Sequence, residues 1–117
     1  MSTLANIVIA IVALLHVYFL VLEMFLWDKP LGLKTFKQTL EKATDSKVLA
    51  ANQGLYNGFL AAGLFWGLSL GTAGFSIKVF FLGCVIVAGL YGAATVGKKI
   101  LFVQAVPAAV GLILLLA

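Results

Sequence analysis

Four long apolar runs, separated by shorter polar stretches, dominate the hydrophobic pattern of the chain. They lie near residues 4–27, 47–71, 75–97 and 99–117. A helix needs about 20 mostly apolar residues to cross the hydrocarbon core of a bilayer, and each run is close to that length or longer. The pattern therefore predicts an all-α fold, an integral membrane four-helix bundle that forms a single transmembrane domain over residues 1–117.

The connection between the first two runs carries a shorter amphipathic pattern. Between Leu31 and Ala43, apolar residues including Leu33, Phe36 and Leu40 recur at spacings of three and four, with lysines between them. This spacing places the apolar side chains on one face of a helix. We expect a short helix that lies in the membrane interface with its lysines near anionic lipid headgroups.

Two local signals refine the ends and the course of these helices. Asp45 and Ser46 precede the second run, and either side chain can accept hydrogen bonds from first-turn amides, so we expect one of them to cap that helix. Pro107 interrupts the fourth run. Because neighbouring groups can satisfy the carbonyl that a proline frees, we expect a kink there rather than a break.

Composition supports a lipid environment. The chain is 63% hydrophobic and only 10% charged, with a mean hydropathy of +1.16. About a quarter of the residues in a soluble domain are charged, so this chain could not cover a water-facing surface. Cys84 is the only cysteine, which excludes a disulfide within the chain.

The basic residues predict the orientation of the chain in the membrane. All eight are lysines, and the net charge is +4. The connections after the first and third runs, which lie on the same side, hold all but one of them: Lys29, Lys34, Lys37, Lys42, Lys47, Lys98 and Lys99. The positive-inside rule places these connections in the cytoplasm and both termini outside a plasma (inner) membrane. Lysines clustered in short loops, without arginine, argue against a nucleic-acid partner.

Glycines predict how the helices pack. The chain has twelve, and Gly54/Gly58 and Gly63/Gly67 form G-x-x-x-G pairs on the second run. Small residues let helix backbones approach closely, which drives association in lipid. We expect these contacts to form within one four-helix bundle; a homodimer built on spare glycine faces is the alternative.

His16 and Glu23 are the candidate catalytic residues. They lie seven residues apart in the first run, which puts them on one helix face, about 10 Å apart along the axis. Ionisable side chains at hydrocarbon depth are costly, and they usually face a bundle interior or a wet cavity.

Further polar side chains fall, by residue counting, in the cytoplasmic half of the membrane. They are Asn52, Gln53, Tyr56, Asn57, Tyr91, Thr95 and Gln104. We expect them to bind a ligand in a pocket that opens to the cytoplasm and has His16 at its floor. Each could instead hydrogen-bond across helices as a structural contact, which contributes about 0.6 kcal/mol on average.

Four stretches carry a family resemblance: HVYFLVLEMFLW (16–27), NQGLYNGFLAAG (52–63), AGLYGAAT (88–95) and QAVPAAVG (104–111). They resemble the small bacterial membrane proteins grouped as domain of unknown function 1304, over essentially the full chain. The resemblance implies four spans in an inner or plasma membrane, and it implies no activity.

The residues favour the binding or conversion of a lipophilic small molecule, with His16 and Glu23 as an acid–base pair. A small transporter or proton-coupled exchanger is an alternative, although the outer half offers almost no polar path. A non-catalytic accessory subunit is another. One His and one Glu are too few ligands for a zinc site, so we expect no metal; haem ligation by His16 across a dimer is not favoured, and we expect no cofactor.

Overall fold

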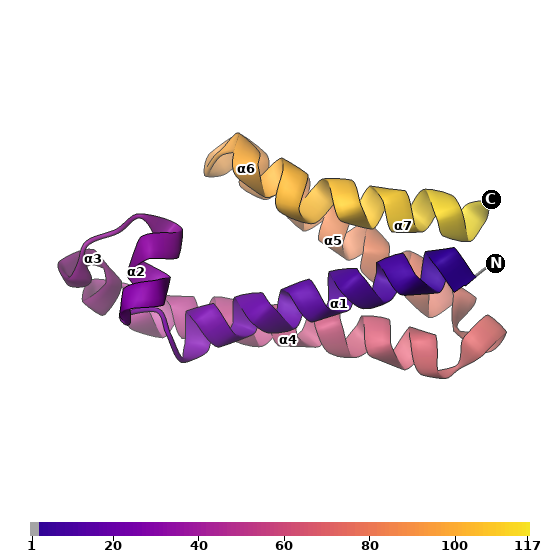
Figure 1. The fold of residues 1–117 in the computed structure, drawn as a ribbon, viewed down its shortest axis with the longest axis horizontal. Helices are drawn as coiled ribbons and strands as arrows, with labels where there is room; N and C mark the ends of the chain where they lie inside the picture. The colour runs from indigo at the N-terminus through magenta and orange to yellow at the C-terminus, as the bar shows by residue number, and fades with distance from the viewer. Residues whose placement is uncertain (1–2) are drawn as a thin grey trace. The chain divides into compact units, whose positions relative to one another are not determined.

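The computed structural model describes residues 3–117, which form helices and contain no strand (Figure 1). In chain order they are α1 (Thr3–Met24), α2 (Pro30–Phe36), α3 (Leu40–Asp45), α4 (Lys47–Ser69), the 3-10 helix η1 (Gly71–Gly74), α5 (Phe75–Thr95), α6 (Lys98–Ile100), the π-helix η2 (Leu101–Ala105) and α7 (Val106–Leu116). The predicted all-α class is confirmed for these residues; residues 1 and 2 of the predicted domain lie outside them.

Within residues 3–117, three helical stretches are long and apolar enough to cross a membrane. They are Thr3–Met24, Gly71–Thr95 and Lys98–Leu116. The α4 helix has 23 residues, which also gives the length of a span. Its first half contains Asn52, Gln53 and Asn57, and these lower its hydropathy. The membrane-spanning character of three helices is therefore supported, and the fourth span and the bundle stay predictions.

The chain divides into two compact units. The larger unit comprises residues up to Leu14 together with Leu60–Ala117, and the smaller unit comprises Leu15–Phe59. Both α1 and α4 contribute residues to each unit. The prediction of a single domain is not tested by this division.

In the larger unit, small and aliphatic side chains form a core between the helices. Its buried members are Ala5, Ile9, Val12, Ala13, Leu64, Leu82, Val85, Ala108 and Leu115. The α5 helix runs alongside α7 (Figure 1). Because lipid tails are as apolar as these side chains, close van der Waals packing rather than transfer from water stabilises such a core inside a bilayer.

The last apolar helix continues through Pro107. In η2, just before the proline, the amide of Val106 donates to the carbonyl of Leu101, five residues back. Proline has no N–H, and its ring clashes with the carbonyl four residues earlier. A wide turn directly before it accommodates both effects, and the helix does not break.

The predicted single interfacial helix over 31–43 is wrong, because the segment forms the two short helices α2 and α3. Lys37 adopts a left-handed conformation (φ 51°) that ends α2. The Thr39 hydroxyl then accepts from the amide of Lys42 at 3.2 Å and begins α3. The apolar spacing continues across this break, but a left-handed residue followed by a threonine cap interrupts the helix.

Trp27 joins the two ends of this connection. Its indole Nε1 donates to Ser46 Oγ at 3.1 Å. The centroid of its ring lies 4.8 Å from that of the Phe36 ring. Beside it, Lys47 Nζ and Asp28 Oδ2 form an ion pair at 2.9 Å. These contacts hold the start of α4 against the residues that follow α1.

Ser46 takes a different role from the predicted side-chain cap. Its hydroxyl donates to the carbonyl of Lys42 at 2.7 Å and accepts from Trp27, while its own carbonyl accepts from Ala50 N at 2.8 Å. Asp45, the other predicted cap, is the last residue of α3. The main chain of Ser46 therefore begins α4, and its side chain closes α3.

Candidate functional site

His16 and Glu23 both lie in α1, within the smaller unit, and the helix is uninterrupted between them. His16 is fully buried, and its ring meets that of Phe19 edge-on with the centroids 5.3 Å apart. Glu23 is partly buried. Phe19 lies three residues after His16 and four before Glu23, so the three side chains share one face of α1.

Glu23 is bonded to α4 through Asn57. The Nδ2 of Asn57 donates to Oε1 of Glu23 at 2.5 Å. Both side chains are partly buried. The structure thus brings together one candidate catalytic residue and one predicted ligand-binding residue.

Two glycines on α4 allow this helix to pack closely against α1. A Cβ at Gly54 would lie 2.5 Å from Met24 Cγ and 3.2 Å from the Leu20 carbonyl oxygen. A Cβ at Gly58 would lie 2.7 Å from Leu20 Cδ1. No side chain could fit between the helices at these positions without displacement, so the glycines let α4 approach α1 as closely as the predicted G-x-x-x-G pair requires.

The other predicted ligand-binding residues of α4 lie away from this contact. Asn52, Gln53 and Tyr56 are exposed, and the ring of Tyr56 meets that of Phe59 with the centroids 6.0 Å apart. The close approach at Gly54 determines which face of α4 meets α1. Asn57 lies three residues further along, on the same face of the helix.

Three predicted ligand-binding residues belong to the larger unit. Tyr91 is 72% exposed. The hydroxyl of Thr95, also exposed, donates back to the carbonyl of Tyr91 at 2.8 Å, a common bond for a threonine inside a helix. Gln104 is partly buried within η2. The predicted convergence of these residues with Glu23 stays a prediction.

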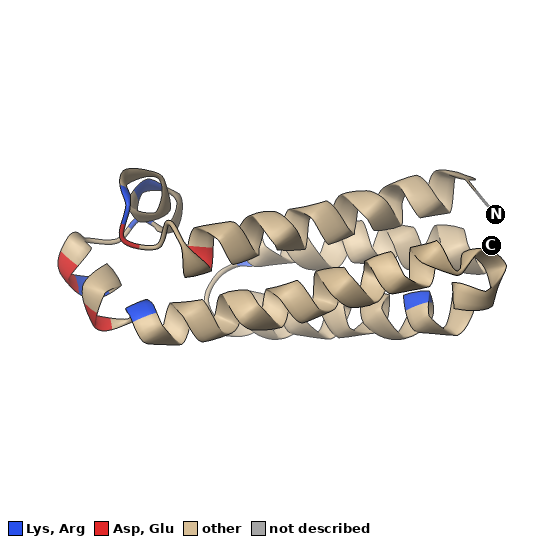
Figure 2. Cartoon of the chain, turned by 90° about the horizontal axis from the view of Figure 1, so that it is seen from below, with Lys and Arg blue, Asp and Glu red and all other residues tan. Residues whose placement is uncertain are grey.

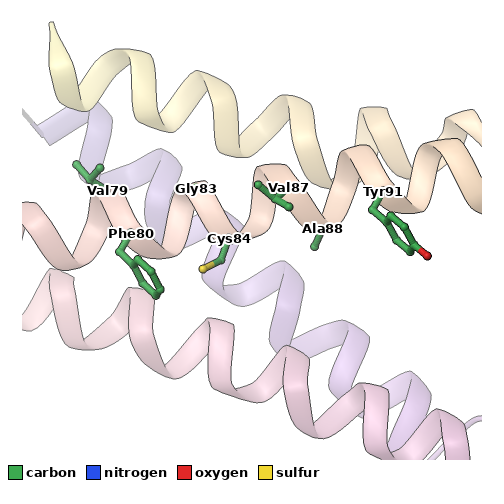
Figure 3. A pocket seen from close by; sticks show the side chains of 7 residues that line it. All are labelled: Val79, Phe80, Gly83, Cys84, Val87, Ala88 and Tyr91. Carbon is green, nitrogen blue, oxygen red and sulfur yellow. The ribbon is translucent and has the colours of Figure 1, made fainter.

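Tyr91 also lines an apolar groove on α5. All seven lining residues come from this helix, and the groove holds about 690 Å³ (Figure 3). They are Val79, Phe80, Gly83, Cys84, Val87, Ala88 and Tyr91. The groove offers almost no polar surface, so it suits hydrocarbon rather than a polar ligand.

Lys78 makes buried polar contacts that the sequence pattern did not predict. It lies in the first turn of α5 and is 4% exposed. Its Nζ donates to Asn6 Oδ1 at 3.1 Å and to the Gly71 carbonyl at 3.2 Å. The sequence does contain an indication of these contacts, because Lys78 lies three residues inside the predicted span 75–97. A cation at that depth needs acceptors.

Charged residues of the smaller unit lie mostly on α2 and α3, beside them, and at the adjoining ends of α1 and α4 (Figure 2). Here the hydrogen bond from Lys47 holds the pKa of Asp28 below its ordinary value. Within residues 3–117, no three His, Cys, Asp or Glu side chains come together as metal ligands would.

Comparison with known proteins places the chain in a family. The model of the family described as "protein of unknown function", domain of unknown function 1304, matches residues 10–116. The chain belongs to this family. The uncharacterized protein YpaA of Lactococcus lactis subsp. lactis (strain IL1403) is 33% identical over 106 residues, which cover 89% of each chain. No solved structure matches the chain.

The match to the family includes both halves of the contact between α1 and α4. Residues 10–116 contain Glu23, Asn57 and the buried His16. In chemical terms, the carboxylate can accept a hydrogen bond or a proton, or it can attract a cation, and the imidazole can donate or accept a proton.

Proposed function

We propose that this member of the family is a plasma-membrane protein that binds or converts a lipophilic small molecule beside Glu23 and Asn57. His16 and Glu23 serve as the acid–base pair. The observation that carries the proposal is the hydrogen bond between Asn57 and Glu23, made by a carboxylate in a helix apolar enough to span a membrane.

A purely structural role explains Asn57 more readily than Glu23. An amide that bonds across two helices is a common interhelical contact. A carboxylate in a spanning helix is far more costly, and such residues usually mark substrate, ion or proton sites. Two neutral amides could hold α1 to α4 equally well, so the choice of a glutamate supports a functional site.

The proposed membrane arrangement has four passes. The α4 helix serves as the fourth span, and packing against other helices shelters its polar residues. The lysine-rich connections lie in the cytoplasm and both termini lie outside. Lipid is thus one partner of the protein, and the lipophilic molecule is the other.

Maleimide labelling tests this topology. In a Cys84→Ser background, Thr3→Cys and Lys37→Cys each place one thiol on an opposite predicted side. In intact cells, a membrane-impermeant maleimide should label Thr3→Cys, whereas Lys37→Cys should react only after lysis. The reverse labelling would overturn the orientation, and equal labelling of both would overturn a separation by a membrane.

Mass spectrometry of co-purifying molecules tests the binding site. Wild type, Glu23→Gln, His16→Ala and Glu41→Gln are purified in mild detergent and their organic extracts compared. Glu41→Gln is the matched control, because Glu41 is an exposed glutamate of α3. We expect a lipophilic molecule that accompanies wild type and the control and falls at least tenfold in Glu23→Gln. Equal content in wild type and Glu23→Gln would overturn the site.

A further inference from the structure

The partner that the structure gives Glu23 is neutral. Its carboxylate accepts from the Asn57 amide. Within residues 3–117, the side-chain ion pair that the structure shows is the one between Lys47 and Asp28. The charge of an ionised Glu23 is therefore not balanced by a lysine of the described chain.

The other acidic residues do not share this position. Asp28, Glu41 and Asp45 all lie in the connection between α1 and α4. Glu41 and Asp45 are exposed, and Asp28 is paired with Lys47. Water solvates the charges of Glu41 and Asp45, and Lys47 balances that of Asp28. Glu23 instead is partly buried within a spanning helix.

The end of α1 adds to the negative potential at this site. The helix ends at Met24, and its last turn contains Glu23 and no basic residue. The C-terminus of a helix carries a partial negative charge of about half an elementary charge, which favours cations nearby. A cation that pairs with the Glu23 carboxylate is therefore also attracted by the end of the helix.

Aromatic surface lies on the same face of α1. Phe19 is one helical turn before Glu23, and its ring also contacts His16. The face of an aromatic ring attracts cations and is also apolar. A ligand next to Glu23 and Phe19 therefore meets negative charge and hydrocarbon together.

From these observations we infer that the small molecule bound at Glu23 is a lipophilic cation, such as an amine or quaternary ammonium with a large hydrocarbon part. This inference rests on the proposed function and specifies its ligand class. The cation pairs with the Glu23 carboxylate, Asn57 holds that carboxylate in place, and Phe19 contacts the hydrocarbon. Anions of the same shape are excluded by repulsion from the carboxylate and from the end of α1.

Tetraphenylphosphonium and tetraphenylborate test the charge, because they share size, shape and phenyl surface and carry opposite charges. Their binding to the full chain in lipid nanodiscs is measured by equilibrium dialysis, with binding to protein-free nanodiscs subtracted. We expect saturable binding of the phosphonium, at least tenfold tighter than any specific binding of the borate. Glu23→Gln should lose this binding, and Glu41→Gln should retain it.

The outcomes separate this inference from the proposed function. Tighter binding of the borate would overturn the inference that the ligand is a cation. Unchanged phosphonium binding in a helical Glu23→Gln variant would overturn it as well. If neither ion binds while a co-purifying lipophile still depends on Glu23, the cation is overturned and the binding site remains. If neither ion binds and no such lipophile exists, both fail. The comparison of the two ions in wild type holds even if Glu23→Gln does not fold.

Discussion

Asn57 Nδ2 donates to Glu23 Oε1 at 2.5 Å, and this bond links α4 to the last turn of α1. The bond satisfies part of the hydrogen-bonding need of a costly carboxylate. It also orients that carboxyl group toward α4. The smaller unit thus combines a close helix–helix approach with a partly buried acidic side chain.

Removal of the Asn57 amide should weaken the helix contact. We expect Asn57→Ala to destabilise the protein by about 1 kcal/mol, because Glu23 loses a donor and interhelical hydrogen bonds in membranes contribute roughly this much. Asn52→Ala, at an exposed position on the same helix, is the matched control and should change little. Thermal unfolding in detergent measures both, and equal effects of the two would contradict the role of Asn57.

Gly54 should tolerate a methyl group poorly. A Cβ there would meet Met24 Cγ, Glu23 Cβ and the Leu20 carbonyl within 3.2 Å, so Gly54→Ala should cost about 1–3 kcal/mol. At Gly83, such a Cβ would point into open space, with nothing of the described chain but its neighbours along α5 nearby. Gly83→Ala should therefore be neutral or stabilise α5 by up to about 1 kcal/mol. Thermal unfolding compares them, and a larger loss at Gly83 would show that the glycine contacts have been misassigned.

Lys78 should contribute more to the stability of the protein than an exposed lysine does. Lys78→Ala removes the donor to Asn6 Oδ1 and to the Gly71 carbonyl, and it should cost about 1–3 kcal/mol because two acceptors lose their partner. Lys99→Ala, at an exposed lysine, should stay within about 0.5 kcal/mol of wild type. Thermal unfolding in detergent compares the two variants. Equal midpoint temperatures would argue that Lys78 contributes no more to stability than a surface charge.

The Asp28–Lys47 pair should lose its effect in acid. Lys47 lowers the pKa of Asp28 in the folded protein, so folding favours the ionised carboxylate. The stabilisation is present above the unfolded pKa and disappears as the pH falls through the lower, folded pKa, below about pH 4. In thermal unfolding, wild type should have a higher midpoint temperature than Asp28→Asn at pH 7. The difference between the two midpoints should shrink by pH 3. A gap that widens in acid would reverse the sign of this linkage.

The sequence predicted the helices well and their contacts less well. Runs of apolar residues predicted spans near 4–27 and 75–97, and α1 and α5 occupy Thr3–Met24 and Phe75–Thr95. Hydrophobic length determines a spanning helix almost independently of its neighbours. The connection between α1 and α4 was mispredicted because periodicity does not report a single left-handed residue such as Lys37.

The contact between α1 and α4 could be predicted from the sequence only in part, and the ligand-binding roles of its residues stay predictions. The candidate ligand-binding residues of α4 included Asn52, Gln53 and Tyr56 as well as Asn57. Of these four, Asn57 lies on the face of α4 that meets α1 through Gly54. Which face of a helix forms the contact depends on close backbone approach, and one chain offers several glycine stripes from which to choose. Lys78 lies inside the predicted span 75–97, and its burial depends on Asn6, far away in the sequence.

An experimental structure of the full chain in lipid nanodiscs, determined together with the molecule that co-purifies with it, tests the central claim most directly. We predict non-protein density within hydrogen-bonding distance of the Glu23 carboxylate, with Asn57 bonded to the same group. A Glu23 that contacts only protein side chains and lipid tails, with the co-purifying molecule bound elsewhere, would contradict the account.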